Sequence, residues 1–86
     1  MASYSVLITK TAAKELEAVP VTDRKRIVSR IRALADDPRP ARAEKLSGED
    51  KYRLRQGNYR ILYEIIDDVL TVTVVKIGHR REVYRR

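Results

Sequence analysis

The sequence contains no cysteine and a single histidine, His79, among its 86 residues. A chain without cysteine forms no disulfide and offers no thiolate ligand, and one imidazole is too few for a structural zinc site. No apolar run approaches the length that crosses a bilayer, and the start, MASYSVLITK, is too short and too alternating for a signal-peptide core. We therefore expect a cytoplasmic protein that uses no metal or other cofactor.

Acidic residues are scarce relative to basic ones: 12 Asp and Glu stand against 19 Lys and Arg, which gives a formal net charge of +7. In a domain of this size, that excess favours an anionic partner, namely a nucleic acid, an acidic protein or an anionic membrane surface. The composition does not change along the chain and no segment repeats, so we expect residues 1–86 to form one small domain. A core this small gains stability from a partner.

The first part of the chain predicts one strand followed by two helices. Residues 4–9 alternate two sets of side chains and are rich in β-branched residues, as is typical of a strand. Thr11 can cap a short helix that ends before Pro20, and Thr22 can cap a second helix that continues to about residue 35. The apolar helix faces comprise Ala12, Leu16, Val19, Ile27, Ile31 and Leu34. The arginines of the second helix lie largely elsewhere, and we interpret them as a solvated face, with contact to RNA as the alternative.

The second part of the chain predicts a three-stranded meander. Residues 36–38, with the sequence Asp-Asp-Pro, and Pro40 end the second helix and begin a loop that continues to residue 50. The expected strands are residues 52–56, 59–66 and 70–77, with turns at residues 57–58 and 67–68. The predicted fold class is therefore α+β, with two N-terminal helices packed on one face of a small, mainly antiparallel twisted sheet in the order β-α-α-β-β-β.

The two turns predict the register of the meander. Gly57 tolerates positive φ at the first central position of a type II′ loop, so Arg55 lies opposite Arg60. Extending the register across the second turn pairs Ile65 with Leu70, Tyr63 with Val72 and Ile61 with Val74. One face then becomes apolar and receives the helices: Leu54, Ile61, Tyr63, Ile65, Leu70, Val72 and Val74. A slip of one residue would bury the arginines, which argues for this register.

Three arginines, Arg53, Arg55 and Arg60, share the opposite face of the predicted hairpin. Like charges directly across two strands destabilise a sheet, so this pattern indicates an anion bound among them. Guanidinium groups stay charged and bind phosphate oxygens in a bidentate manner, and a sheet holds them more rigidly than a loop. The alternative is that the side chains are splayed and solvated, with Glu64 as a partial counter-ion.

The last residues combine basic charge with the imidazole of His79 and the ring of Tyr84, and Gly78 lets the chain leave the sheet sharply before them. Basic charge beside a stacking ring is typical of single-stranded RNA recognition. Cleavage of RNA needs no metal when cations stabilise the phosphorane-like transition state and a side chain moves a proton. The alternative is that His79 is solvated and that Tyr84 packs on the sheet edge.

Three blocks of sequence carry a resemblance to a known family: Lys45-Leu46-x-Gly48, residues 52–64 (YRLRQGNYRILYE) and residues 78–84 (GHRREVY). In this order and spacing the chain resembles the RelE toxins of the RelE/ParE superfamily, over essentially its whole length. The resemblance implies the same fold and the toxin half of a type II toxin–antitoxin pair. It also implies a metal-independent endoribonuclease that cleaves mRNA in the ribosomal A site through attack by the 2′-OH.

The resemblance also implies site residues, which by position are Arg53, Arg55, Arg60, Arg80 and Tyr84. Arginines would hold the phosphate, and Tyr84 would stack on a base of the mRNA. Arginine replaces the lysine of the best-known pattern at the first two strand positions, and a guanidinium is a far poorer proton acceptor than an amine, so Arg55 is a poor general base. His79 is therefore a further catalytic candidate, as YoeB-type relatives resemble this arrangement in using a C-terminal histidine as acid. Further RNA contacts are expected from Lys45, Lys51, Lys76 and Arg81.

The partners implied by the resemblance are mRNA, the 70S ribosome with its 16S rRNA, and a cognate RelB-like antitoxin that wraps around the toxin. The free toxin is expected to be a monomer. No membrane partner is implied. Two alternatives stay open. The first is a ParE-like inhibitor of DNA gyrase, although such members generally lack the arginine-plus-tyrosine set, and the second is a non-catalytic basic module that binds an acidic antitoxin.

Overall fold

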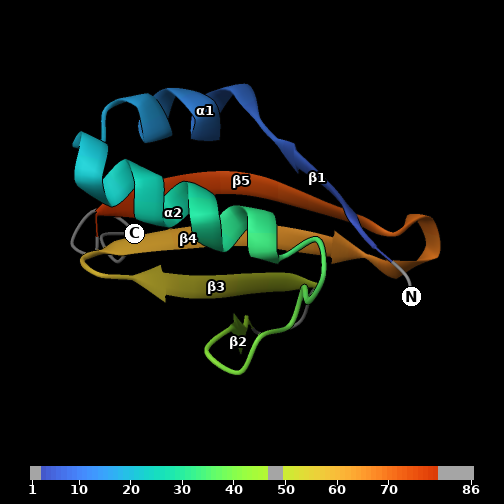
Figure 1. The fold of residues 1–86 in the computed structure, drawn as a ribbon. Coiled ribbons are helices and arrows are strands. Elements are labelled where there is room, and N and C mark those ends of the chain that lie inside the picture. Colours follow the sequence, from blue (N-terminus) through green and yellow to red (C-terminus); the bar gives the residue numbers. More distant parts are fainter. Residues whose placement is uncertain (1–2, 47–49, 80–86) are drawn as a thin grey trace.

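The computed structural model describes residues 3–46 and 50–79. Helices α1 (Lys10–Glu17) and α2 (Val21–Ala33) lie on one face of a five-stranded sheet (Figure 1). The strands are β1 (Ser5–Ile8), β2 (Glu44–Lys45), β3 (Lys51–Gln56), β4 (Tyr59–Ile66) and β5 (Thr71–His79). Their order is β1-β5-β4-β3-β2, with β1 parallel to β5 and the other neighbours antiparallel. The predicted fold class is confirmed.

Strand β2 lies within the segment that we expected to be a loop. It pairs with β3, so that Glu44 is opposite Arg53 and Lys45 is opposite Tyr52. A strand of two residues is too short to show the alternation by which strands are recognised in a sequence. Its presence matters because it brings an acidic residue beside the basic strand β3.

The helix starts differ from the predicted ones. Thr9, rather than Thr11, caps α1, because its Oγ1 accepts a hydrogen bond from the N–H of Ala12 at 3.1 Å. Helix α2 begins directly after Pro20, and within the described chain no side chain caps it. Thr22 is therefore inside the helix. A proline at a helix start already has a helix-compatible φ and lacks the N–H that would need a partner.

The hairpin between β3 and β4 has the predicted register. Arg55 is opposite Arg60 and Tyr52 is opposite Tyr63, whose rings stack with centroids 5.7 Å apart. Gly57 has a φ of 60°, in the left-handed region that glycine adopts without strain. The predicted register is confirmed. It could be predicted because a two-residue loop leaves the strands only one way to pair.

The hairpin between β4 and β5 has a register that differs from the predicted one by two residues. Ile65 is opposite Val72, and Tyr63 is opposite Val74. The turn is longer than expected because residues 67–69 form a short 3-10 helix and Leu70 follows with a φ of 47°. The prediction that Leu70 lies in the core is wrong, since it is 40% exposed. A shift of two residues keeps the same side chains on each face, so the valines remain buried.

An extra residue in β5 changes the register again near its end. Lys76 is opposite Leu62, whereas Val74 is opposite the next residue of β4, so Val75 forms a bulge. Beyond the bulge Gly78 stays in β5 opposite Arg60. The prediction that the chain leaves the sheet at Gly78 is therefore wrong.

The core fills the space between the helices and one face of the sheet (Figure 1). It contains Ala12, Val19, Ile27, Ile31, Leu34, Tyr52, Leu54, Ile61, Tyr63, Ile65, Val72, Val74 and Ile77. Because side chains of a strand alternate between faces, the residues between these core positions point to the other side. That other face carries the candidate site.

Candidate functional site

Arg53 and Arg55 extend from β3, and Arg60 extends from β4, on the sheet face opposite the helices. Their neighbours Leu54 and Ile61 are buried in the core, and strand alternation therefore directs the arginines the other way. The three residues, called the arginine face below, come together because of the confirmed hairpin register. Their like charges favour a bound anion.

Arg60 differs from the other two arginines because it is almost completely enclosed, with 1% of its surface exposed. Its neighbours across the sheet are Arg55 on one side and Gly78 on the other. The alternative of three solvated arginines is therefore wrong for Arg60. A guanidinium keeps its charge when buried, and low-dielectric surroundings strengthen its field. The arginine face thus has a positive charge fixed at its centre.

Among the described residues, Glu44 is an acidic residue that contacts the arginine face, and sequence reasoning missed it. Its Oε1 accepts hydrogen bonds from Nε and Nη2 of Arg53, at 3.1 and 2.9 Å. These hydrogen bonds lower the pKa of the Glu44 carboxyl, and the charges of all three arginines lower it further. The expected counter-ion, Glu64, instead lies 3.9 Å from the ammonium of Lys51. The contact joins two neighbouring strands, so the spacing of residues along the sequence does not reveal it.

His79 is the last described residue of β5, and its register places it away from the arginine face. It pairs with Tyr59, and the two rings meet edge to face with centroids 5.5 Å apart and an interplanar angle of 80°. Tyr59 packs against the core, on the helix side of the sheet. A hollow of about 350 Å³ beside these rings also borders Glu15 of α1. The structure therefore does not bring His79 together with the arginines.

The three described lysines of the expected site have separate positions. Lys51 lies on the same face as Arg53, two residues along β3, whereas Lys45 pairs with Tyr52 and lies on the opposite face. Lys76 Nζ donates to Glu15 Oε2 at 2.7 Å, and this contact ties β5 to α1. Only Lys51 is therefore placed to extend the arginine face.

Three further residues of the expected site, Arg80, Arg81 and Tyr84, lie outside the described residues, and the roles implied for them stay predictions.

Within residues 3–46 and 50–79, no group of three or more His, Asp or Glu is placed to hold a metal ion. Over the same ranges, each helix is too short or too polar to cross a bilayer.

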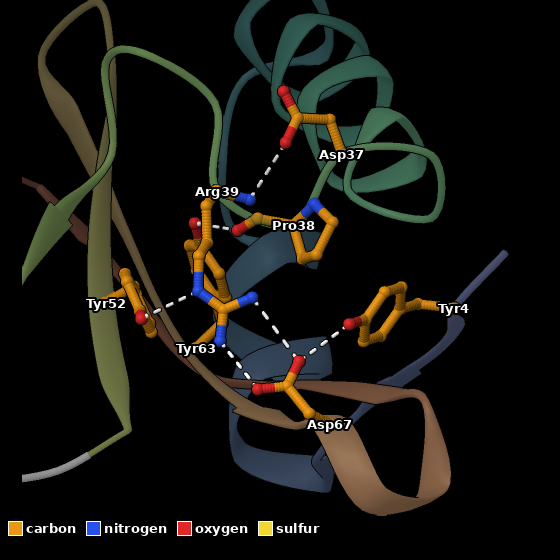
Figure 2. Close-up of polar contacts among 7 residues, drawn as sticks. All are labelled: Tyr4, Asp37, Pro38, Arg39, Tyr52, Tyr63 and Asp67. Carbon is orange, nitrogen blue, oxygen red and sulfur yellow. Dashed lines mark hydrogen bonds and ion pairs between the residues drawn. The ribbon is translucent and has the colours of Figure 1, made fainter. Parts of the chain in front are cut away.

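A second arginine cluster, also missed in the sequence, centres on Arg39 (Figure 2). Its Nε donates to Tyr52 Oη at 2.9 Å, and its Nη2 donates to Asp67 Oδ2 at 2.8 Å. Tyr4 Oη donates to Asp67 Oδ1 at 2.6 Å. We call Tyr4, Arg39, Tyr52 and Asp67 the Arg39 cluster. It ties the loop after α2 to β3, to the turn after β4 and to the residue that precedes β1.

The Arg39 cluster keeps Asp67 ionised and Tyr4 neutral near neutral pH. Hydrogen bonds from Arg39 and then from Tyr4 lower the pKa of Asp67, while the hydrogen bond to Asp67 raises the pKa of Tyr4. Behind Tyr52, the hydroxyl of Tyr63 donates to the carbonyl of Pro38, and burial raises the pKa of Tyr63 to about 12. Opposite charges are therefore matched here, which indicates a structural role.

Two of the α2 arginines also have structural partners. Arg24 Nη2 donates to the carbonyls of Glu17 and Val19 at the end of α1, where a cation compensates the helix dipole. Arg30 Nε donates to Gln56 Oε1 at 2.7 Å. The prediction of a solvated face is therefore wrong for these two arginines.

Comparison with known proteins defines the class. Residues 6–84 match the family model described as the ParE toxin of the type II toxin–antitoxin system parDE. The fold is shared with a solved structure of the toxin–antitoxin complex RelBE2 from Mycobacterium tuberculosis, with a TM-score of 0.81 and 30% identity. That match covers 93% of this chain and 94% of the other. The class is that of type II toxins.

Two curated relatives define the family within that class. Toxin RelG of Mycobacterium tuberculosis is 34% identical over 88 residues, which cover 96% of this chain and 98% of the relative. The mRNA interferase toxin RelE of Escherichia coli is 31% identical, over 95% of this chain and 90% of the relative. The chain belongs to the RelE/ParE superfamily and is a toxin of the RelE type.

Proposed function

We propose that the protein is a ribosome-dependent mRNA interferase, a metal-independent endoribonuclease that cleaves mRNA in the ribosomal A site and so inhibits translation. The observation that supports this proposal most is the enclosed Arg60, held opposite Arg55 on a rigid hairpin. The name of the Escherichia coli relative, an mRNA interferase, supports the same activity. Clustered guanidiniums on a sheet suit a phosphodiester because their field is in place before the substrate arrives.

In the proposed reaction, the 2′-oxygen of one nucleotide attacks the adjacent phosphorus while the bond to the 5′-oxygen breaks. The 2′-hydroxyl loses a proton and the leaving 5′-oxygen gains one, so the products carry a 2′,3′-cyclic phosphate and a 5′-hydroxyl. Negative charge that grows on the phosphate oxygens is stabilised by Arg53, Arg55 and Arg60. No oxidant, reductant or metal takes part.

Roles for the C-terminal residues follow the family resemblance. We propose that Arg80 adds a cation beside the phosphate and that Tyr84 stacks on a base and moves a proton. His79 is a weaker candidate for proton transfer than Tyr84, because its ring packs against Tyr59 on the helix side of the sheet. The guanidinium of Arg55 stays protonated and has no acceptor site, so we do not assign it the role of base.

The proposed partners are the ribosome, mRNA and a RelB-like antitoxin. Solved neighbours in fold include the RelBE2 toxin–antitoxin complex. The net charge of +7 suits an antitoxin with an acidic or amphipathic segment that covers the arginine face. Such a segment would inhibit by occupying the phosphate site, and the free toxin would be monomeric.

A second candidate function is inhibition of DNA gyrase. The observation that favours it is the matching family model, which is described as the ParE toxin. The observation against it is the arginine face together with Arg80 and Tyr84, a set that ParE-like members generally lack. A gyrase supercoiling assay distinguishes the two functions, because only the second predicts loss of supercoiling.

The proposed function is tested by adding the purified protein to programmed ribosomes and mapping mRNA ends by primer extension. We expect cuts within the A-site codon, and we expect them to disappear in the Arg60→Ala, Arg80→Ala double variant. Arg42→Ala, in the exposed loop before β2, is the matched control and should cleave normally. Intact mRNA with the wild-type protein would contradict the proposal.

A further inference from the structure

Glu44 is an anion that the arginine face already holds in the protein alone. One oxygen of its carboxylate, Oε1, accepts from both Nε and Nη2 of Arg53. Two adjacent N–H groups on one edge of a guanidinium are the same donors that bind phosphate oxygens. Glu44 and an RNA phosphate therefore need the same edge of the same side chain.

The position of Glu44 is determined by the backbone and not by chance contact of long side chains. Strand β2 pairs with β3 so that Glu44 lies directly opposite Arg53. The strand is two residues long and lies at the edge of the sheet, and the Glu44 side chain is 53% exposed while that of Arg53 is 21% exposed. A solvated carboxylate on a short edge strand can leave without disturbing the core.

The surroundings of Glu44 keep it ionised at neutral pH. Arg53 lowers its pKa most, through hydrogen bonds and charge, and the charges of Arg55 and Arg60 contribute as well. The carboxylate therefore neutralises part of the field that would otherwise act on a phosphate. Glu44 accepts its hydrogen bonds from Arg53, and its charge also acts on Arg55 and Arg60.

We propose that Glu44 is an internal competitor of the RNA phosphate, bound to Arg53 in the free protein and exchanged for phosphate when substrate binds. The identity of the ligand as RNA rests on the proposed function, whereas the exchange itself concerns any phosphate. Competition between Glu44 and the phosphate weakens the binding of RNA that is not held by a ribosome. Stable binding then requires the additional contacts of a ribosome, so Glu44 contributes to selectivity for ribosome-bound mRNA.

The exchange is tested by titrating the protein with inorganic phosphate and with a 2′-O-methyl oligoribonucleotide that has no 2′-hydroxyl to attack. The N–H signal of Arg53 Nε in a nitrogen-15 NMR spectrum reports occupancy of the contested edge. We expect Glu44→Gln to bind both probes about two- to five-fold more tightly than wild type, the range that corresponds to loss of an exposed ion pair. Glutamine keeps the shape and an acceptor oxygen but removes the charge.

Two controls make the test specific. Glu17→Gln removes the same charge from an exposed position in α1, on the other side of the sheet, and should bind the probes about as wild type does. In an Arg53→Ala background, the gain in affinity from Glu44→Gln should be smaller, because the contested guanidinium is gone and only the longer-range effect on Arg55 and Arg60 remains.

The proposal is overturned if Glu44→Gln binds phosphate no more tightly than wild type, or if Glu17→Gln gains as much. It is also overturned if the gain is undiminished without Arg53. Because inorganic phosphate and the methylated RNA are not cleaved, these results are independent of whether the protein cuts mRNA. Absence of cleavage with the expected phosphate result would reject the proposed function and leave the exchange intact.

Discussion

The two arginine clusters of this small sheet use the same chemical groups in different ratios. In the Arg39 cluster, one guanidinium meets one carboxylate, and tyrosine hydroxyls complete the hydrogen bonds of both (Figure 2). On the arginine face, three guanidiniums stand on adjacent strands, and Glu44 accepts hydrogen bonds from one of them. Balanced charge ties segments together, whereas an excess of one sign creates a site for a ligand.

The clusters also differ in their effect on stability. Burial of a charge is costly, and directly opposed like charges repel, so Arg60 opposite Arg55 is an arrangement that folding alone would not favour. The Arg39 cluster has no such conflict, although its ion pair is partly exposed and its contribution is modest. Four predictions test this difference, in order of decreasing effect.

The largest effect is expected from Arg60→Met, which keeps much of the side-chain volume and removes the charge. Cleavage on programmed ribosomes should fall about 100-fold or more, as when a fixed stabilising charge is removed from an active site. Unfolding in urea, measured in parallel, separates loss of the charge from loss of the fold. Loss of both activity and stability would show that Arg60 is structural.

Arg39→Ala should lower stability and leave the cleavage rate nearly unchanged. It removes the hydrogen bonds to Tyr52 and Asp67, so the free energy of unfolding should decrease by about 1 kcal/mol. The cleavage rate per folded molecule should stay within about twofold of wild type, since Arg39 bonds to the Tyr52 side chain on the core side of the sheet, opposite the arginine face. Urea denaturation and single-turnover cleavage measure the two quantities. A large loss of activity at unchanged stability would contradict the structural assignment.

The Asp67 carboxylate should make part of the stability depend on pH. Arg39 and Tyr4 lower its pKa in the folded state, so the protonated unfolded chain is favoured once pH falls. The contribution is complete above the unfolded pKa of about 3.9 and is lost as pH falls through the lower, folded pKa. The difference in unfolding free energy between wild type and Asp67→Asn should therefore be constant above about pH 5 and shrink below pH 4. A difference that grows on acidification would be inconsistent with this sign.

The smallest effect is expected from His79→Ala. Because the ring packs edge-on against Tyr59 and away from the arginine face, cleavage should decrease by less than about threefold. The pH profile of cleavage should also keep its shape, which single-turnover rates between pH 5 and 8 would reveal. If the part of the pH profile at low pH changed shape in the variant, His79 would take part in proton transfer.

The hairpins show which features of the sheet a sequence can predict. Gly57 lies in a two-residue loop that permits one register, and the arginine pair follows from it. The second turn contains no glycine, and its length depends on a 3-10 turn that ends in Leu70 with positive φ. A leucine in that conformation is held by its surroundings rather than by its own preference, so local sequence does not reveal it.

The residues of the candidate site could be predicted only where the strand pairings that bring them together could be predicted. Arg53, Arg55 and Arg60 were found because strand alternation and one tight turn determine where they lie. Glu44 and Arg39 were missed because their partners are reached through β2 and through the loop before it, neither of which has a periodic pattern. The enclosure of Arg60 depends on the packing of the finished fold.

The most direct test of this account compares Arg55→Ala with Arg39→Ala in the same two assays, cleavage on programmed ribosomes and unfolding in urea. Arg55 is exposed, so its variant isolates the charge of the arginine face from effects on folding. We expect Arg55→Ala to lose A-site cleavage at wild-type stability and Arg39→Ala to lose stability at near wild-type cleavage. If both variants lose activity only in proportion to their loss of stability, the arginine face is not the site of the reaction.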